Sequence, residues 1–235
     1  MESGGLVRTV AIHQPNYLPW CGFFYKMMHC DVFILLDDAQ YTKNSLINRN
    51  KIKGSQGEIL LTVPVRASLE TKISDVEIAH PKATQKHLKA IQANYAKAPY
   101  FKTYFDEIGQ ILTSSAELSE LNEALIRQIA HWLGITCDIV RSSDFEVHSV
   151  SDHRLVDLVQ AVDGQRYLSG EGGKSYQADA TYQNADIELQ YTGFSSPMYP
   201  QQWGPFIFNL SVIDILLNCG PEAGDLIRNS KKEQI

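Results

Sequence analysis

The stretch VRTVAIHQPNYLPWCGFFYKMMHCDVFILL, residues 7–36, decides the fold of this chain. Residues 7–12 are mostly apolar and predict a buried strand, which ends before the two prolines that follow. Residues 22–30 carry aromatic residues and methionine at helical spacing, and residues 32–36 form a second apolar run of strand length. A strand, a short helix and another strand make a βαβ unit, whose strands are parallel. Because parallel sheets are covered on both faces, this stretch predicts an α/β protein.

The rest of the chain continues the alternation of strands and helices. Residues 58–65 predict a further strand, with a pairing segment expected at 73–78. The predicted helices are 82–98, 100–113, 117–134, 151–162 and 209–218, and the remaining predicted strands are 137–140, 166–168 and 187–191. We therefore expect a single α/β domain over residues 1–235. Its central sheet is expected to be mixed, mostly parallel and flanked by helices, with a helical subdomain at 82–134.

Composition narrows the classes of partner. The formal net charge of −6 argues against a nucleic-acid partner, because neutralising phosphates requires a basic surface. No apolar run approaches the roughly 20 residues that cross a bilayer, and the first residues lack the features of a signal peptide, so we expect no membrane insertion. The four cysteines have no CxxC spacing. This argues against a disulfide framework or a zinc site and favours a cytoplasmic location.

Chemically active side chains cluster where predicted strands end. His13 and Gln14 follow the first strand, Asp37 and Asp38 follow the second, and Ser169 opens a glycine-rich segment after a later strand. In open α/β sheets, ligands bind beyond the carboxyl ends of the strands. We therefore expect one crevice at this edge of the sheet to hold all three sets of side chains.

His13 is the best candidate for a general base. An imidazole titrates near neutral pH, and the neighbouring Gln14, Tyr17 and Trp20 suit a binding site. The alternative interpretation is a histidine that ends the strand and binds backbone, in a turn that the two prolines make rigid.

The acidic pair Asp37 and Asp38 also has two interpretations. One carboxylate is suited to orienting His13 or to binding an amine or a metal ion, and the alternative is an Asx turn at the end of the strand. We expect one functional and one structural member of this pair.

The segment SLINRN, residues 45–50, presents many hydrogen-bond donors. Arg49 is suited to a bidentate contact with phosphate or carboxylate, while Ser45, Asn48 and Asn50 add hydroxyl and amide groups. The alternative is a solvated polar loop. Two asparagines beside an arginine favour ligand contact.

The segment SGEGGKSY, residues 169–176, is a glycine-rich turn after a predicted strand. Such a turn predicts a nest of backbone N–H groups for a phosphate or an oxyanion. It matches neither a P-loop nor a dinucleotide-binding fingerprint, so nucleotide binding does not follow from it.

Cys21 is the best placed thiol, because it follows Trp20 at the predicted start of a helix. A helix N-terminus lowers the pKa of a thiol, whereas a small buried hydrophobic residue is the favoured alternative. His148 and His153 lie near the start of a later helix, but their spacing does not define a metal site.

Several long motifs together resemble one protein family. AIHQPNYLPWCGFFYK, DVFILLDDAQYTKNSLINRNKI, LTVPV, YLSGEGGKSY and YPQQWGPFIFNLSVIDILLNCGPE resemble the WbqC-like family of bacterial proteins, over about residues 7–222. The resemblance implies a role in O-antigen and other surface-polysaccharide clusters or in natural-product biosynthesis. It implies acyl or aminoacyl transfer to amino sugars or other amines, with a carrier-protein thioester or another activated acid as donor.

The resemblance also implies a set of site residues. Catalytic roles are expected for His13, Gln14, Asp37 and Asp38, and substrate-binding roles for Tyr17, Trp20, Gln40, Ser45, Asn48, Arg49, Asn50, Ser169, Gly170, Gly172, Gly173, Tyr176 and Tyr199; the family pattern also covers Asn209, Ser211 and Asp214. Cys21 departs from the pattern, because an ordinary apolar residue is expected after the PW pair. This departure weakens a mechanism with a cysteine nucleophile.

The leading hypothesis is an N-acyltransferase that forms an amide on a small-molecule amine such as a nucleotide-activated amino sugar. His13 takes the proton of the amine, and Asp37 or Asp38 orients the imidazole or binds the ammonium group. Backbone N–H groups near Gly172 and Gly173, with Gln14 or Asn48, stabilise the oxyanion, and Arg49 and Lys53 hold a phosphate. No metal or other cofactor is expected, and an acyl or peptidyl carrier protein is the expected protein partner.

Two other hypotheses stay open. One is a thioester or amide hydrolase that uses Cys21 as nucleophile with a histidine. The other is a non-catalytic module that binds a sugar or a nucleotide, with Tyr17, Trp20 and Trp203 as stacking platforms.

Overall fold

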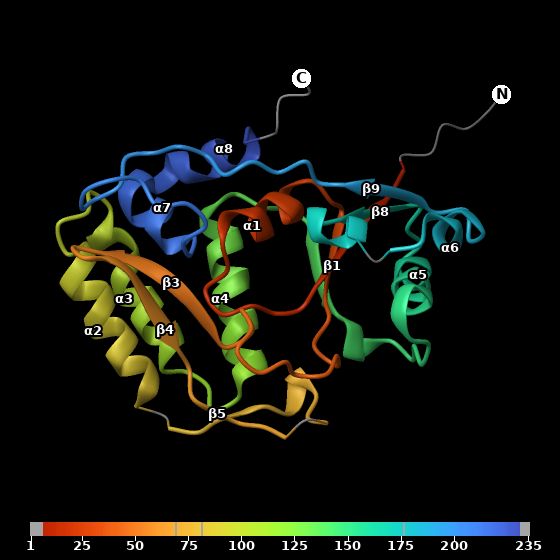
Figure 1. Cartoon of the computed structure of the whole chain (residues 1–235), viewed down its shortest axis with the longest axis horizontal. Coiled ribbons are helices and arrows are strands. Elements are labelled where there is room, and N and C mark those ends of the chain that lie inside the picture. Colours follow the sequence, from red (N-terminus) through yellow and green to blue (C-terminus); the bar gives the residue numbers. More distant parts are fainter. Residues whose placement is uncertain (1–6, 69, 81, 176, 231–235) are drawn as a thin grey trace.

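The computed structural model describes residues 7–68, 70–80, 82–175 and 177–230. Its centre is a five-stranded parallel sheet in the order β7-β2-β1-β8-β9 (Figure 1). The strands are β1 (Thr9–His13), β2 (Val32–Leu35), β7 (Asp138–Arg141), β8 (Arg166–Ser169) and β9 (Glu188–Tyr191). The predicted βαβ unit is confirmed, because β1 and β2 are parallel neighbours joined by α1 (Cys21–Met28).

Successive residues of the central strands point into two separate hydrophobic cores. In β1, Val10 and Ile12 belong to one core, whereas Ala11 belongs to the other. This alternation follows from the two-residue period of a strand, and it requires helices on both faces. One core includes residues of α5 (Ser151–Ala161) and α6 (Asp179–Gln183); the other includes residues of α1, α4 (Leu118–Trp132), α7 (Ile213–Cys219) and α8 (Ala223–Arg228). The predicted α/β class is therefore confirmed.

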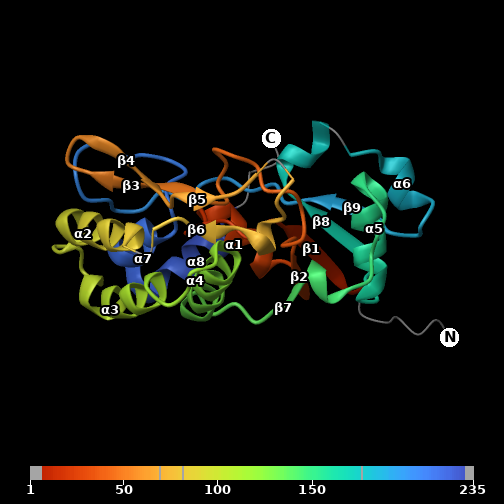
Figure 2. The same ribbon diagram turned by 90° about the horizontal axis from the view of Figure 1, so that it is seen from below.

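The antiparallel strands lie outside the central sheet, in two small hairpin-like sheets. They are β3 (Arg49–Gly54) with β4 (Gly57–Thr62), and β5 (Val65–Arg66) with β6 (Glu77–Ile78). The β3–β4 pair lies beside α2 (Ala83–Tyr95) and α3 (Phe101–Leu112) at one end of the molecule, while α5 and α6 lie at the other end (Figure 2). Three helices thus occupy the region predicted to be helical, and the division into a domain with a subdomain at 82–134 stays a prediction. Among the described residues, no helix has the length and apolar character needed to cross a membrane.

The prediction of a helix over residues 209–218 is wrong at its beginning. Ser211 pairs with Trp20 in an isolated bridge, and α7 begins only at Ile213. The backbone N–H of Ser211 donates to the carbonyl of Lys51, and that of Val212 donates to the carbonyl of Pro19. Ser211 and Val212 therefore connect the loop between β1 and α1 to β3 instead of starting the helix.

The loop between β1 and α1 is buried and irregular, and distant segments bind its backbone. Asn122 of α4 is fully buried, and its amide donates to the carbonyl of Pro15 (2.9 Å) and to that of Ile47 (2.8 Å). The amide of Asn50 donates to the carbonyl of Leu18 (2.6 Å), a residue held at a φ of 42°. A non-glycine residue at this φ is strained, so the surrounding contacts must hold it in place.

We predict that Asn122→Ala lowers the free energy of unfolding by about 2–4 kcal/mol, because it leaves two buried carbonyl groups without their donor. Chemical denaturation followed by circular dichroism measures this loss. Gln128→Ala, a change in the same helix outside this contact, is the control and is expected to cost less than about 0.5 kcal/mol. Equal stabilities of the two variants would contradict the role assigned to Asn122.

Candidate functional site

The order of the strands brings the predicted polar residues to one edge of the sheet. β1 lies between β2 and β8, and His13 pairs in register with Leu35. Asp37 therefore follows the strand on one side of His13, and Ser169 ends the strand on the other side. This edge, at the carboxyl ends of the parallel strands, is the usual location of ligand sites in such sheets.

His13 is held in one tautomer by its neighbour. Its Nδ1 lies 2.9 Å from the carbonyl oxygen of Gln14. Because a carbonyl only accepts, Nδ1 carries the proton and Nε2 carries the lone pair. The ring also packs edge-on against Phe23, with 4.9 Å between the ring centroids. Although the residue is partly exposed, burial lowers the pKa of His13 to about 3, assisted by the positive charge of Lys26, so the imidazole does not titrate near neutral pH as we expected.

Lys26 is a member of this site that the sequence analysis missed. It lies on α1 with only 4% of its surface exposed, and its Nζ donates to the carbonyl of Ile12 at 2.7 Å. The ammonium group also lies 5.9 Å from the centre of the Phe33 ring. Burial lowers the pKa of Lys26 to about 8. A lysine among the apolar residues of a short helix was the available sequence signal.

Asp37 and Asp38 have other partners than His13. Asp37 is buried and accepts from the backbone N–H of Ser143 (3.0 Å) and its hydroxyl (2.7 Å). Asp38 forms an ion pair with Arg154 of α5 and accepts from the hydroxyl of Ser142. The expectation that a carboxylate orients the imidazole is therefore wrong, because the Gln14 carbonyl occupies Nδ1. Arg154 is a second charged residue that the sequence analysis did not identify.

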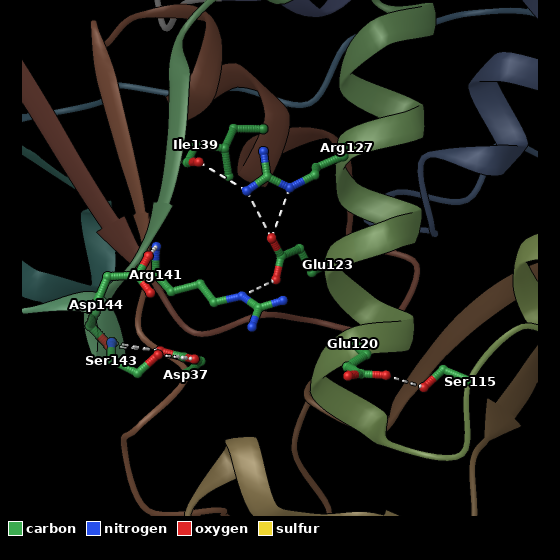
Figure 3. A network of polar contacts seen from close by, with 10 residues as sticks. Asp37, Ser115, Glu120, Glu123, Arg127, Ile139, Arg141, Ser143 and Asp144 are labelled. Carbon is green, nitrogen blue, oxygen red and sulfur yellow. Dashed lines mark hydrogen bonds and ion pairs between the residues drawn. The ribbon is translucent and has the colours of Figure 1, made fainter.

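A charged network beside Asp37 joins α4 to the end of β7 (Figure 3). The carboxylate of Glu123 accepts from Nε of Arg127 (2.8 Å) and from Nε of Arg141 (2.5 Å). Arg127 also donates to the carbonyl of Ile139 (2.9 Å). The network fixes the position of the β7 end, and therefore of the serines that hold Asp37.

The glycine-rich segment after β8 forms a tight turn that includes a 3-10 helix, η3 (Glu171–Ser175). The backbone N–H of Gly173 donates to the carbonyl of Gly170 (2.9 Å), so it is not free to bind an oxyanion as we expected. A Cβ on Gly173 would lie 2.4 Å from Oγ of the buried Ser169, whereas Gly170 and Gly172 face open space. Tyr176 lies outside the described residues.

The residues of the SLINRN segment divide into buried and accessible members. Asn48 and Asn50 are buried, and their amides donate to the carbonyls of Val63 and Leu18. Both amide donors therefore bind backbone carbonyls, and of the two residues Asn50 also lines the cleft described below. Ser45 donates to the carbonyl of Thr42 within a turn, and Arg49 contacts Asn44.

Gln40 and Lys53 are two further predicted polar residues. Gln40 is exposed and pairs with Lys72 in an isolated bridge. Lys53 is buried, and its Nζ donates to Oε1 of Gln201 (3.0 Å) and to the carbonyl of Pro205 (2.6 Å). The expectation that Lys53 holds a phosphate is wrong, because its ammonium group binds the segment before α7.

A cleft of about 650 Å³ brings Trp20 and Arg49 together with residues of β3, β4 and the segment before α7. Phe208 lines this aromatic cleft and has 53% of its surface exposed. Trp20 packs against Phe194, with 5.3 Å between the ring centroids. The other lining residues are Leu46, Asn50, Lys51, Glu58, Leu60 and Asn209.

Of the three predicted binding tyrosines, the two that the structure describes lie below the surface or close to it. Tyr17 is completely buried, and its hydroxyl donates to Nδ1 of His87 at 2.7 Å, so it offers no stacking surface. Tyr199 is partly exposed and accepts from the amide of Gln201 (3.2 Å). Burial raises the pKa of both hydroxyl groups.

Cys21 is buried, and burial raises the pKa of its thiol to about 12. The thiol is therefore protonated at neutral pH, which argues against a nucleophilic thiolate. His148 and His153 are both exposed. Within the described part of the chain, no group of three or more histidine, cysteine or acidic residues is arranged to hold a metal ion.

The low pKa of His13 predicts a loss of stability in acid. The unfolded chain binds a proton near pH 6.5 and the folded chain only near pH 3, so stability falls as the pH drops through this interval. At pH 5 the full pKa shift corresponds to a loss of about 2 kcal/mol in the free energy of unfolding. Because His13 is partly exposed, we expect a smaller loss of about 1 kcal/mol. Between pH 7 and pH 5, we expect the free energy of unfolding of His13→Asn to fall by about 1 kcal/mol less than that of the wild-type protein. Urea unfolding at the two pH values measures this difference. His153→Gln, at an exposed position, is the control and keeps the wild-type slope.

The charge of Lys26 leads to a separate prediction about the pKa of His13. Lys26→Met removes the buried ammonium group at similar volume, so the pKa of His13 is expected to rise while burial still keeps it below its usual value. Titration of the imidazole signals by NMR measures the change. Lys43→Met, at an exposed position, serves as the control; an unchanged His13 pKa in Lys26→Met would contradict the coupling.

Comparisons with known proteins agree with the resemblance inferred from the motifs. The family model described as the WbqC-like protein family matches residues 14–226. The uncharacterized protein Rv1507c of Mycobacterium tuberculosis (strain ATCC 25618 / H37Rv) is 35% identical over 229 residues, which cover 94% of this chain and 98% of that relative. The chain therefore belongs to the WbqC-like protein family.

Proposed function

We propose that this protein is an N-acyltransferase or N-aminoacyltransferase that forms an amide on a small-molecule amine. The observation that carries the proposal is the neutral imidazole of His13 at the carboxyl edge of the sheet, with Nδ1 bound to Gln14 and a lone pair on Nε2. This is the protonation state that a base requires at neutral pH, but the low pKa makes His13 a weak base in the free protein, so proton transfer to it depends on the negative charge that forms during the reaction. The family resemblance supports an amino sugar as acceptor and a carrier-protein thioester as donor.

The proposed reaction joins the acceptor nitrogen to the acyl carbon and breaks the carbon–sulfur bond. Nε2 of His13 accepts the proton that the amine loses, and the negative charge forming on the acyl oxygen stabilises the imidazolium. Because the site lowers the pKa of His13, this imidazolium is a strong acid and returns its proton readily to the departing thiolate. The products are an amide and a thiol, and His13 ends as it began.

Two further features support the proposed transfer reaction. Lys26 places a positive charge near the reacting edge, which favours a developing oxyanion. The aromatic cleft at Trp20 and Phe208, with Arg49 on its wall, suits the body of an acceptor that combines a ring with an anionic group. We extend the proposal to the cytoplasmic assembly of surface polysaccharides or natural products, where carrier-bound acyl donors and amino sugars occur together.

We predict that His13→Asn lowers acyl transfer at least about 100-fold while the fold stays intact. The asparagine amide replaces the Nδ1–H donor to Gln14 but leaves no group at the position of Nε2. Mass spectrometry of amide products, formed from acyl-pantetheine thioesters and nucleotide-activated amino sugars, measures the transfer. Cys21→Ser is the control and keeps full activity.

The outcomes separate the three functional hypotheses. Full activity of His13→Asn would contradict the proposed mechanism. Loss of activity in Cys21→Ser, with labelling of Cys21 by the acyl donor, would support the hydrolase instead. The remaining hypothesis is a non-catalytic module that binds a sugar or a nucleotide, for which the aromatic cleft offers a site. It predicts saturable ligand binding without any product.

A further inference from the structure

A second cavity, of about 600 Å³, lies away from His13, at the beginning of α2. Its lining comes from the end of β4 and the chain between β4 and β5, and from the residues around the start of α2. The lining residues are Thr62, Pro64, His80, Lys82, Ala83, Lys86 and His87. We call this cavity the α2 pocket.

Two lysines that line the α2 pocket have no acidic partner among the described residues. Lys82 and Lys86 are both exposed, so their ammonium groups are accessible. Within the described part of the chain, neither lysine forms an ion pair, and none of the lining residues is acidic. The first turn of α2 also contains no acidic residue, so the positive end of the helix dipole is not neutralised.

The floor of the α2 pocket is apolar. The buried His87 donates from Nε2 to the carbonyl of Thr62 (3.2 Å), and its Nδ1 accepts from the hydroxyl of Tyr17 (2.7 Å). With both nitrogens occupied, His87 offers the pocket the face or edge of its ring and no free N–H. Pro64 and Ala83 add further apolar surface.

We infer that the α2 pocket binds a phosphate monoester whose phosphate lies between Lys82 and Lys86 and whose apolar body rests on the floor. Two unpaired lysines match the double negative charge of such a group. The cavity has the volume of a small-molecule site, and its lining combines an apolar surface with a few charged groups. This inference does not depend on the acyl-transfer chemistry proposed at His13.

The floor also connects the α2 pocket to the loop between β1 and α1. His87 touches the cavity and holds Tyr17, which lies four positions after His13. The imidazole signals of His87 are therefore a local probe of occupancy, separate from any measurement of enzyme activity.

Calorimetric titration with phenyl phosphate at low ionic strength tests the inference on the full chain. Lys82→Gln and Lys86→Gln are each expected to weaken binding about tenfold, because each removes one charge-assisted contact. Lys89→Gln is the matched control: it removes the same charge from an exposed position of the same helix, outside the lining, and is expected to change affinity less than twofold. All three positions are exposed, so the variants are expected to fold.

Further ligands test the chemistry of the occupant. Inorganic phosphate lacks the apolar body and benzoate carries one negative charge, so both are expected to bind more weakly than phenyl phosphate. Phenyl phosphate is also expected to shift the imidazole signals of His87 in NMR spectra. The inference is overturned if wild-type protein shows no saturable binding, if Lys89→Gln loses as much affinity as Lys82→Gln, or if benzoate binds as tightly as phenyl phosphate.

Discussion

The buried loop between β1 and α1 imposes the constraint on which the rest of the structure depends. Its backbone carbonyls lie in the protein interior, where an unpaired polar group is costly, and two of its residues are prolines without an N–H. Asn122 and Asn50 satisfy carbonyls of this loop, and Val212 donates its backbone N–H to another. Helix α4, strand β3 and the segment before α7 must therefore meet at one place.

A buried lysine of α1 determines the electrostatics of the sheet edge. Lys26 binds the last carbonyl before His13, so an ammonium group is held under the end of β1 without a carboxylate beside it in the described structure. The acidic residues of the neighbouring strand are turned towards Ser143 and Arg154 instead. The result is a neutral histidine in a locally positive environment, which suits a reaction that develops negative charge.

The aromatic cleft and the α2 pocket offer different kinds of ligand contact. The aromatic cleft combines Trp20 and Phe208 with one arginine, whereas the α2 pocket combines two lysines with an apolar floor. Both lie against the β3–β4 hairpin, β3 and β4 lining the first and Thr62 at the end of β4 lining the second. The hairpin, which is separate from the central sheet, therefore contributes to both candidate binding surfaces.

The sequence by itself determined the βαβ unit, a mostly parallel sheet and the convergence of His13, Asp37 and Ser169 at one edge, because hydrophobic period is a property of local pattern and parallel strands end at the same edge of a sheet. Only the tertiary structure decided which polar groups form hydrogen bonds within the protein. Asp37 meets Ser142 across 105 positions, and Tyr17 meets His87 across 70. Such contacts bury Tyr17 and Asn48, lower the pKa of His13 and leave Arg49 and Trp20 accessible. No local pattern specifies them, because each depends on which distant segment is packed alongside.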